Sequence, residues 1–306
     1  ALKRLHGTSK AYGCASYLLT PPESAEKIPL LAPPQFVGSL FIPRGMIVKG
    51  SHVTGALARE AEAMDAAKFV GHTAMTDIEV KNGRVTAVLT NNPTMPRIEC
   101  ENVLLAANIW APALSEKFGI HLPLMAFEHQ YVITNDLNRL AEFDPANKDH
   151  EVTYPTMREL DSTMYYRQHW QAYGIGSYYH KPHMVRPQDV KKTAIHDFTP
   201  DDFFGKPWEQ AKRLLPAIAQ ADAVGFQRQF NGMFALSIDG MPIIGESQVK
   251  GFWTAVASWI THAGGVAKSV AEWMTHGETE WDMRQAHLHR FHQFQTTEAY
   301  TTVITK

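Results

Sequence analysis

Cysteine is scarce in this chain. Only two of its 306 residues are cysteines, Cys14 and Cys100. Two thiols so far apart form no CxxC motif, zinc knuckle or disulfide framework, because each of these needs a closer or larger set of cysteines. This scarcity is typical of proteins from a reducing compartment, and we expect the bacterial cytoplasm or the mitochondrial matrix.

Long apolar runs and a surplus of one charge are also absent. The longest apolar runs, such as residues 103–107, are far shorter than the roughly 20 residues of a membrane-spanning helix. The first residues show no apolar core of a secretory signal. Lys and Arg number 29 against 31 Asp and Glu, for a formal net charge of -2. This balance gives no charge-based reason to expect a nucleic acid or an acidic membrane as a partner.

What is present is the composition of a packed globule. Hydrophobic residues make up 44% of the chain, and the length suits one large domain or two ordinary ones. The pattern predicts a helix that opens at Ser51 as N-cap, and a hairpin with an Asn82-Gly83 turn. Residues 20–38, which are rich in proline, predict irregular surface chain with one short helical turn. Further strands are expected at residues 103–107, 130–134, 164–168 and 173–178, and a helix at 207–215.

The C-terminal third has the clearest order of elements. A strand over residues 251–257 precedes a turn with Gly264 and Gly265, and then a helix that Gly277 ends. We expect Gly264 and Gly265 at the start of this helix, where the missing Cβ atoms let the backbone approach a flat ligand. The helix N-terminus then favours a ligand that gains negative charge. The alternative is that both glycines serve only tight packing between helix and strand.

Several motifs occur along the chain in one consistent order. They are E-H-Q-Y-V-I-T at residues 128–134, M-Y-Y-R-Q-H at 164–169, Y-G-I-G-S-Y at 173–178, D-G-x-P-x-x-G-E at 239–246, G-F-W at 251–253 and T-H-x-G-G-V-A-K at 261–268. This ordered set resembles the D-amino-acid-oxidase-like flavoproteins. Within them it is similar to the branch of dimethylglycine oxidase, dimethylglycine dehydrogenase and sarcosine dehydrogenase.

The resemblance implies a set of site residues. His129 corresponds to the family's active-site histidine, and Tyr165 to its active-site tyrosine, which also lies against the flavin. Met75 falls where the backbone contacts the adenosine part of FAD. The remaining cofactor-binding positions correspond to Ser258, Trp259, Ile260, Thr261, His262, Gly264 and Gly265. Asn108 stands where the family commonly has glycine, which bears on how closely the backbone approaches the cofactor there.

The implied activity is the FAD-dependent oxidation of a small N-methyl amine such as dimethylglycine or sarcosine, which is an oxidative demethylation. A hydride moves from the carbon next to nitrogen to N5 of the flavin. The amine must be neutral for this step, and histidine is the side chain that titrates near neutral pH. Outside such an ordered set of motifs, a His-Gln-Tyr run more often contributes to packing or to the surface than to catalysis.

Two further patterns predict neither a metal nor a cofactor site. His287, His289 and His292 have no acidic partner close by in the sequence, so we expect a solvated, weakly structured tail and no metal. Gly174-Ile175-Gly176 is similar to half of a dinucleotide fingerprint, but the third glycine and a preceding apolar strand are missing.

No G-x-G-x-x-G motif occurs in the chain, although FAD enzymes of this type hold the pyrophosphate with one. The resemblance implies that a second chain or a missing N-terminal segment supplies the dinucleotide-binding unit and any covalent FAD attachment site. It also implies that a tetrahydrofolate-binding region follows Lys306 in some relatives. The expected fold is α/β, with an incomplete Rossmann-like FAD-binding domain interleaved with a β-sheet-rich substrate domain.

We expect five segments along the chain. They are a substrate-side segment at residues 1–50, an FAD-domain segment at 51–118, the substrate-binding domain at 119–235, the C-terminal FAD-cradling segment at 236–285, and a tail or linker at 286–306.

Two other functions stay open. One is a non-catalytic regulatory or interaction role on the same scaffold, because the regulatory subunit of pyruvate dehydrogenase phosphatase resembles the same family. The other is a module that binds an amine without redox chemistry. The joint presence of His129, Tyr165 and the turn at residues 261–265 favours the enzyme, since a regulatory relative has no need of all three.

Overall fold

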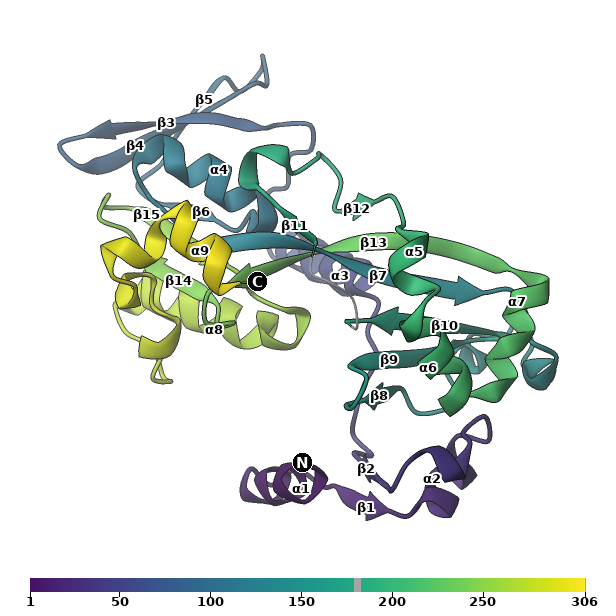
Figure 1. Cartoon of the computed structure of the whole chain (residues 1–306). Helices are drawn as coiled ribbons and strands as arrows, with labels where there is room; N and C mark the ends of the chain where they lie inside the picture. Colours follow the sequence, from purple (N-terminus) through teal and green to yellow (C-terminus); the bar gives the residue numbers. More distant parts are fainter. Residues whose placement is uncertain (179–182, 306) are drawn as a thin grey trace. The chain divides into compact units, whose positions relative to one another are not determined.

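The computed structural model describes residues 1–178 and 183–305 (Figure 1). Contacts between residues divide the chain into two compact units. Unit 1 comprises Ala1–Met46, Glu128–His183 and Thr193–Met233, and unit 2 comprises Ile47–Phe127, Met184–Lys192 and Phe234–Lys306. The chain therefore passes repeatedly from one unit to the other. Residues 119–127 and 184–192 group with unit 2, and the five expected segments stay a prediction.

Most of unit 1 is built on one sheet with two distinct faces. The strand order is β12 (Ile195–His196), β13 (Phe226–Ser237), β7 (Leu124–Thr134), β10 (Ala172–Ser177), β9 (Met164–His169) and β8 (Met157–Glu159), and β11 (His183–Val185) pairs with β7. Buried and partly exposed side chains alternate along β9, so Tyr166 points to one face and Tyr165 to the other. The strands expected at residues 130–134, 164–168 and 173–178 are confirmed as parts of β7, β9 and β10.

The core of unit 1 lies on the Tyr166 face. Short helices pack there with the sheet: α5 (Pro200–Phe203), α6 (Lys206–Leu214) and α7 (Ala221–Val224). The residues that follow α2 (Pro21–Lys27) join the same core. α6 confirms the helix predicted at 207–215, with Pro207 in its first turn. α2 confirms the short helical turn expected within residues 20–38. The expectation of surface chain for the rest of this segment is wrong at Ile28 and Leu30, which are buried in this core. A capping box of Thr20 and Glu23 starts α2 at a fixed point, and the residues after the helix turn inward.

The first residues of unit 1 form a small element of their own. α1 (Leu2–Ala11) precedes β1 (Tyr17–Leu19), which pairs antiparallel with β2 (Ser39–Phe41).

Unit 2 contains two three-stranded sheets. In the first, β15 (Phe252–Val256) lies between β14 (Ile243–Glu246) and β6 (Val103–Leu105), and β15 and β6 are parallel. The second is a meander of β3 (Met75–Lys81), β4 (Arg84–Thr90) and β5 (Arg97–Glu99). Its hairpin turns at Asn82 and Gly83, both with positive φ, which confirms the predicted turn.

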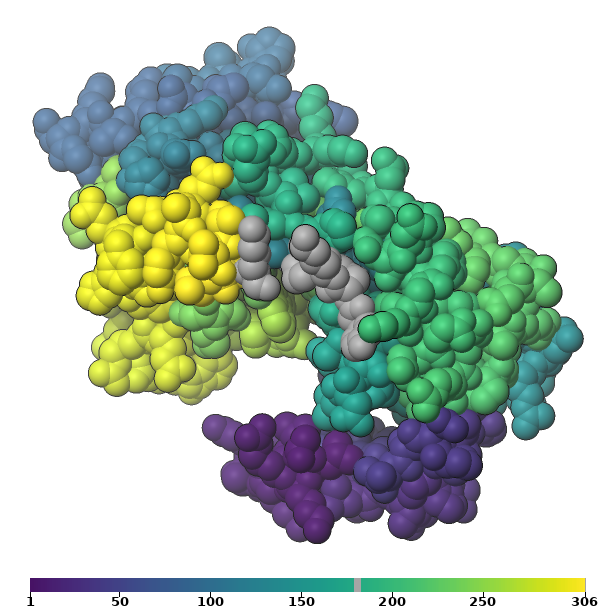
Figure 2. All heavy atoms as spheres, viewed as in Figure 1, coloured from purple at the N-terminus to yellow at the C-terminus, as the bar shows by residue number. Residues whose placement is uncertain are grey.

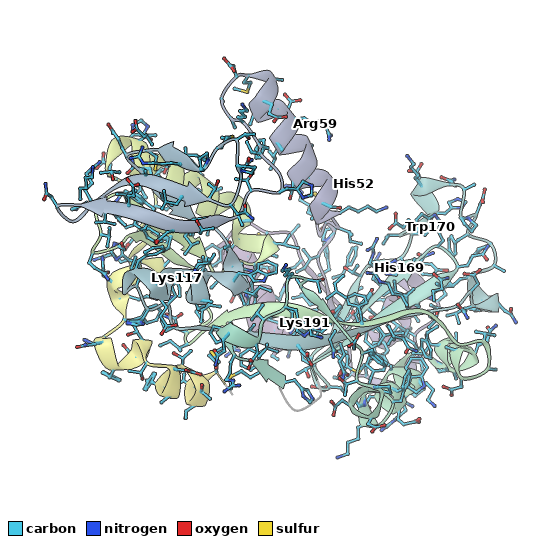
Figure 3. The ribbon with its side chains drawn as sticks, turned by 90° about the horizontal axis from the view of Figure 1, so that it is seen from above. His52, Arg59, Lys117, His169, Trp170 and Lys191 are labelled. Atoms are coloured by element: carbon cyan, nitrogen blue, oxygen red, sulfur yellow. The ribbon has the colours of Figure 1, made fainter. Side chains whose placement is uncertain are left out.

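Two helices of unit 2 differ in how much of their surface is covered. α8 (Ile260–His276) packs through Val266 and Val270 next to Ile244, and it ends at the predicted Gly277, whose φ is 81°. α3 (Gly50–Ala63) has no buried residue, and Figure 3 labels His52 and Arg59 along it. α3 begins before the expected N-cap: Lys49 takes that position without a side-chain bond, and Ser51 lies inside the helix.

The last segment is folded onto unit 2, so the expectation of a solvated tail is wrong. Ala286 and Leu288 are only 3% and 7% exposed, and Arg290 pairs with Asp239 (Nε–Oδ2 2.7 Å). The chain then forms α9 (Glu298–Ile304), and Figure 2 shows these C-terminal atoms closely packed. The sequence did not predict this, because few apolar residues of the segment are buried and the ion-pair partner of Arg290 lies far away along the chain.

Candidate functional site

The predicted site residues fall into two groups, one in each unit. His129 and Tyr165 belong to unit 1, whereas Met75 and residues 258–265 belong to unit 2. Each group has its own geometry.

In unit 1, His129 and Tyr165 form a hydrogen-bonded pair. His129 Nε2 lies 2.8 Å from the Tyr165 hydroxyl oxygen. The two rings are stacked, with 5.4 Å between their centroids and 19° between their planes. His129 is on β7 and is only 6% exposed, and Tyr165 is on β9. Strand β10 lies between them, and the register sets Tyr165 opposite Gly176 and Gly176 opposite Tyr131. The structure therefore brings together the two predicted catalytic residues.

Further aromatic rings surround this pair. The Tyr178 ring lies 4.1 Å from that of His129, and the Tyr131 ring is stacked on Tyr165 at 5.7 Å and 16°. Burial raises the pKa of Tyr165 well above its ordinary value, with Tyr178 and Tyr131 adding to the effect. Burial also raises the pKa of Tyr131 to about 12. Both hydroxyls are therefore neutral near pH 7 and able to donate a hydrogen bond.

Two glycines of β10 make room for these tyrosines. A Cβ atom on Gly174 would lie 1.8 Å from the Tyr131 hydroxyl oxygen, and one on Gly176 would lie 2.0 Å from Cζ of Tyr165. The segment that is similar to half of a dinucleotide fingerprint is thus a strand on which two tyrosine rings rest.

The sequence did not single out Tyr131, His169 or Tyr178. The Tyr131 hydroxyl lies 3.0 Å from Nε2 of His169, so a second His–Tyr pair accompanies the first. Strand alternation could have found it. His129 and Tyr131 are two residues apart on one strand, and Tyr165 and His169 are four apart on another, so each set shares a face.

Two arginines lie on β8 and β9 near these rings. Arg167 is neutralised by Glu151, with Nη2 and Oε1 2.6 Å apart. Arg158 is opposite Tyr165 in the β8–β9 register, and its guanidinium carbon lies 5.1 Å from the Tyr178 ring centroid. Among the described residues, no carboxylate forms an ion pair with Arg158.

In unit 2, the loop after β15 contains strained backbone and an unsatisfied hydroxyl. Ala257 has a φ of 53°, and its N–H donates to Oδ1 of Asn108 at 3.0 Å. Asn108 itself has a φ of 45°, so it keeps the left-handed backbone for which glycine is suited. The next residue, Ser258, has a buried Oγ with no hydrogen-bond partner among the described residues.

α8 begins at Ile260, so the expectation that Gly264 and Gly265 open the helix is wrong. Both glycines lie in its second turn, because the helix starts where the chain leaves the extended Trp259. Residues 259–264 are exposed, Ile260 at 72%. A Cβ atom on Gly264 would meet nothing within 4 Å, so packing inside the chain does not require glycine there. One on Gly265 would lie 3.4 Å from the Trp281 ring.

These features of unit 2 fit a flavin. The unpartnered Ser258 hydroxyl, the positive end of α8 and the open space over Gly264 suit a flat ring with an edge that becomes negatively charged. Met75 lies apart from them in the sequence, as the partly buried first residue of β3, paired with Thr90. Within the described ranges there is no group of three or more His, Cys, Asp or Glu that could hold a metal. None of the described helices has the length and apolar character to cross a membrane.

The chain is similar to curated relatives along nearly its whole length. It is 27% identical to mitochondrial sarcosine dehydrogenase of Mus musculus over 96% of this chain and 31% of that protein. It is 26% identical to the mitochondrial pyruvate dehydrogenase phosphatase regulatory subunit of Mus musculus, over 98% of this chain and 33% of that protein. The chain is also 25% identical to mitochondrial dimethylglycine dehydrogenase of Homo sapiens, over 92% of this chain and 32% of that protein. The chain spans about a third of the length of these relatives.

The fold also matches a solved structure. L-proline dehydrogenase from P. horikoshii superposes with a TM-score of 0.77 and 22% identity, over 94% of this chain and 72% of that one. The model of the FAD dependent oxidoreductase family matches residues 1–273. These findings confirm the predicted resemblance and fold class, and the chain belongs to the FAD dependent oxidoreductase family.

Proposed function

We propose that the chain acts in the FAD-dependent oxidation of a small N-methyl amine such as dimethylglycine or sarcosine. The observation that carries this proposal is the buried, hydrogen-bonded pair of His129 and Tyr165 within a set of aromatic rings. Relatives named sarcosine dehydrogenase and dimethylglycine dehydrogenase support the choice of substrate.

The side chains of unit 1 suit the preparation of such an amine. FAD would supply the acceptor for the hydride of the carbon next to nitrogen, and water would split the resulting iminium into formaldehyde and the demethylated amine. His129 takes the proton of the substrate ammonium, because only the neutral amine has a lone pair to assist this step. The neutral Tyr165 hydroxyl orients the nitrogen, and the face of the Tyr178 ring attracts the methylated cation before it loses its proton.

Arg158 is the cation that we assign to the substrate carboxylate. In dimethylglycine and sarcosine one carbon separates the carboxylate from nitrogen. Arg158 lies over the Tyr178 ring, which in turn contacts His129, so a carboxylate at Arg158 places the nitrogen near His129. Arg167 is less suited, because Glu151 already neutralises it.

The cofactor is assigned to the second group of residues. Ser258, the exposed residues 259–262 and the second helical turn of α8 with Gly264 and Gly265 would hold the isoalloxazine, and the backbone at Met75 would hold the adenosine part. We assign the dinucleotide-binding unit to a second chain or to a segment outside these 306 residues, since α3 exposes its apolar residues Val53 and Leu57 at 44% and 66%. A tetrahydrofolate-binding region and the compartment stay predictions.

The products test this proposal. The complete, flavin-loaded protein is incubated with dimethylglycine that carries ¹³C in its methyl groups. We expect labelled formaldehyde and sarcosine in equal amounts. Turnover of neither dimethylglycine nor sarcosine by a protein that binds FAD would contradict the assignment.

A regulatory role is the second candidate. It is favoured by the 26% identity to the pyruvate dehydrogenase phosphatase regulatory subunit over 98% of this chain. The same incubation distinguishes the two, because a regulatory subunit releases no formaldehyde.

A further inference from the structure

The two glycines of β10 create a gap in the side-chain layer of the sheet. Every other residue type would place a Cβ atom there, and at Gly176 that atom would meet Cζ, Cε1 and the hydroxyl of Tyr165 at 2.0 to 2.4 Å. Carbon atoms in contact are normally about 3.5 to 4.0 Å apart. The ring of Tyr165 therefore lies directly on the backbone of β10, in a position that only glycine permits.

The second glycine carries the second His–Tyr pair. A Cβ atom on Gly174 would lie 1.8 Å from the Tyr131 hydroxyl oxygen and 2.7 Å from Nε2 of His169. Both atoms of the 3.0 Å hydrogen bond between Tyr131 and His169 thus rest over Gly174. His169 is the last residue of β9, and Figure 3 labels it together with Trp170. The Tyr131 ring is held at its hydroxyl by His169 and at its root by β7.

The fixed ring of Tyr131 supports Tyr165. The two rings are nearly parallel, at 16° and 5.7 Å between centroids, and the hydroxyl of Tyr165 is hydrogen-bonded to Nε2 of His129. We propose that Tyr131, held by His169 over the glycine gap, is a positioning residue that directs the Tyr165 hydroxyl to Nε2 of His129. Catalytic groups need to be held within about 0.5 Å of their productive geometry, and a rigid stack on a central strand provides this.

This inference rests on the proposed function, because it assigns the stack a role in presenting Tyr165 to the amine. The stack could instead serve stability alone. The two roles differ in what happens when it is removed while the fold is kept: positioning predicts loss of the His129–Tyr165 bond, whereas a stability role predicts only a lower melting temperature.

The chain offers a matched control for a glycine substitution. Gly232 is on β13 of the same sheet, and a Cβ atom there would lie 3.8 Å from the Phe230 ring and 3.9 Å from the His129 carbonyl oxygen. These are ordinary contacts. Gly232→Ala therefore adds the same methyl group to the same sheet without displacing a ring, whereas Gly176→Ala must displace Tyr165.

The test uses the flavin-loaded protein with ¹⁵N-labelled histidine. The first readout is the Nε2 resonance of His129, with Tyr165→Phe as the reference for a broken hydrogen bond. We expect Gly176→Ala and Tyr131→Leu to move this resonance to the Tyr165→Phe position, and Gly232→Ala to leave it unchanged. Tyr131→Phe, which keeps the ring, serves as the milder variant if Tyr131→Leu fails to fold, and we expect an intermediate shift.

The second readout is flavin reduction by dimethylglycine in rapid mixing. A misplacement of 1 Å can cost about 100-fold in rate, so we expect Gly176→Ala to lower the limiting rate by about that factor with little change in the dissociation constant. An unchanged His129 resonance in folded Gly176→Ala and Tyr131→Leu would overturn the inference. If no N-methyl amine reduces the flavin of the unsubstituted protein, the proposed function fails, and the resonance alone then decides whether the stack sets the His129–Tyr165 bond.

Discussion

The two groups of site residues differ in how far the chain completes them by itself. In unit 1 Nε2 of His129 and the hydroxyls of Tyr165 and Tyr131 have hydrogen-bond partners, and the rings contact one another. In unit 2 the Ser258 hydroxyl has no partner among the described residues, and Trp259 and Ile260 are 45% and 72% exposed. A buried polar atom without a partner costs roughly 1 to 3 kcal/mol unless something else satisfies it. This difference is what we expect if the first group is arranged in advance and the second binds the flavin that we propose.

The largest expected effect is that of replacing His129, which belongs to the group in unit 1. General acid–base catalysis contributes about 100- to 10,000-fold, so His129→Asn should lower the rate of flavin reduction by a factor in that range. The dissociation constant of FAD should not change, because His129 belongs to the other group. Rapid-mixing spectroscopy and a flavin titration measure the two quantities, and a loss of both together would argue against separate roles.

Gly264 offers the converse test. Gly264→Val fills the open space over α8, so we expect the dissociation constant for FAD to rise about 10-fold or more. A loss of about 1.4 kcal/mol in binding free energy lowers the affinity tenfold. The melting temperature of the flavin-free protein should not fall, because valine is no worse than glycine in a helix. Ala267→Val on the exposed side of the same helix is the control. Equal FAD affinity in both variants would place the flavin elsewhere.

A substitution of Arg158 tests whether unit 1 binds the carboxylate of the substrate. Arg158→Gln should raise the dissociation constant of dimethylglycine about 10- to 100-fold, because a charge-assisted hydrogen bond contributes about 1.5 to 3 kcal/mol. The limiting rate of flavin reduction should change much less. An N-methyl amine without a carboxylate should bind equally to both proteins, and a similar loss for that amine would remove the assigned role.

The smallest expected effect concerns alkaline pH. The native pKa of Tyr131 is raised to about 12, so between about 10 and 12 the native state holds a proton that the unfolded state has lost. Stability is therefore fully present below pH 10 and falls as the pH rises toward 12, by on the order of 1 to 3 kcal/mol for this group. Tyr131→Phe should show a shallower fall in urea midpoint between pH 9 and 11. Tyr165, Tyr166, Tyr173 and Tyr178 act in the same direction, so part of the fall remains. An identical slope in the variant would contradict the assignment.

Local patterns in the sequence predicted much of the fold. The Asn82-Gly83 turn, the α6 helix and the glycine that ends α8 depend on nearby residues, and each was found where predicted. Contacts between distant residues could not be predicted in this way. The tail is held by Arg290 and Asp239, 51 positions apart, and its polar composition therefore predicted a solvated segment.

The sequence predicted the pair of His129 and Tyr165, but not the residues that surround and support it. Family motifs indicated His129 and Tyr165, and the structure brings them within hydrogen-bond distance. Gly174 and Gly176 were considered only as a phosphate-binding pattern, because a glycine in a sequence does not show which ring lies above it. The start of α8 was misplaced for a related reason, since exposed residues 260–263 carry no apolar period that marks a helix.

The most direct test of the central claim is the visible spectrum of the complete native protein, recorded without oxygen before and after addition of dimethylglycine. The account predicts an oxidised flavin band that bleaches with the amine in the unsubstituted protein, and that persists for far longer in His129→Asn. A protein without a flavin band, although every chain of the native assembly is present, would contradict the claim that this chain serves in amine oxidation.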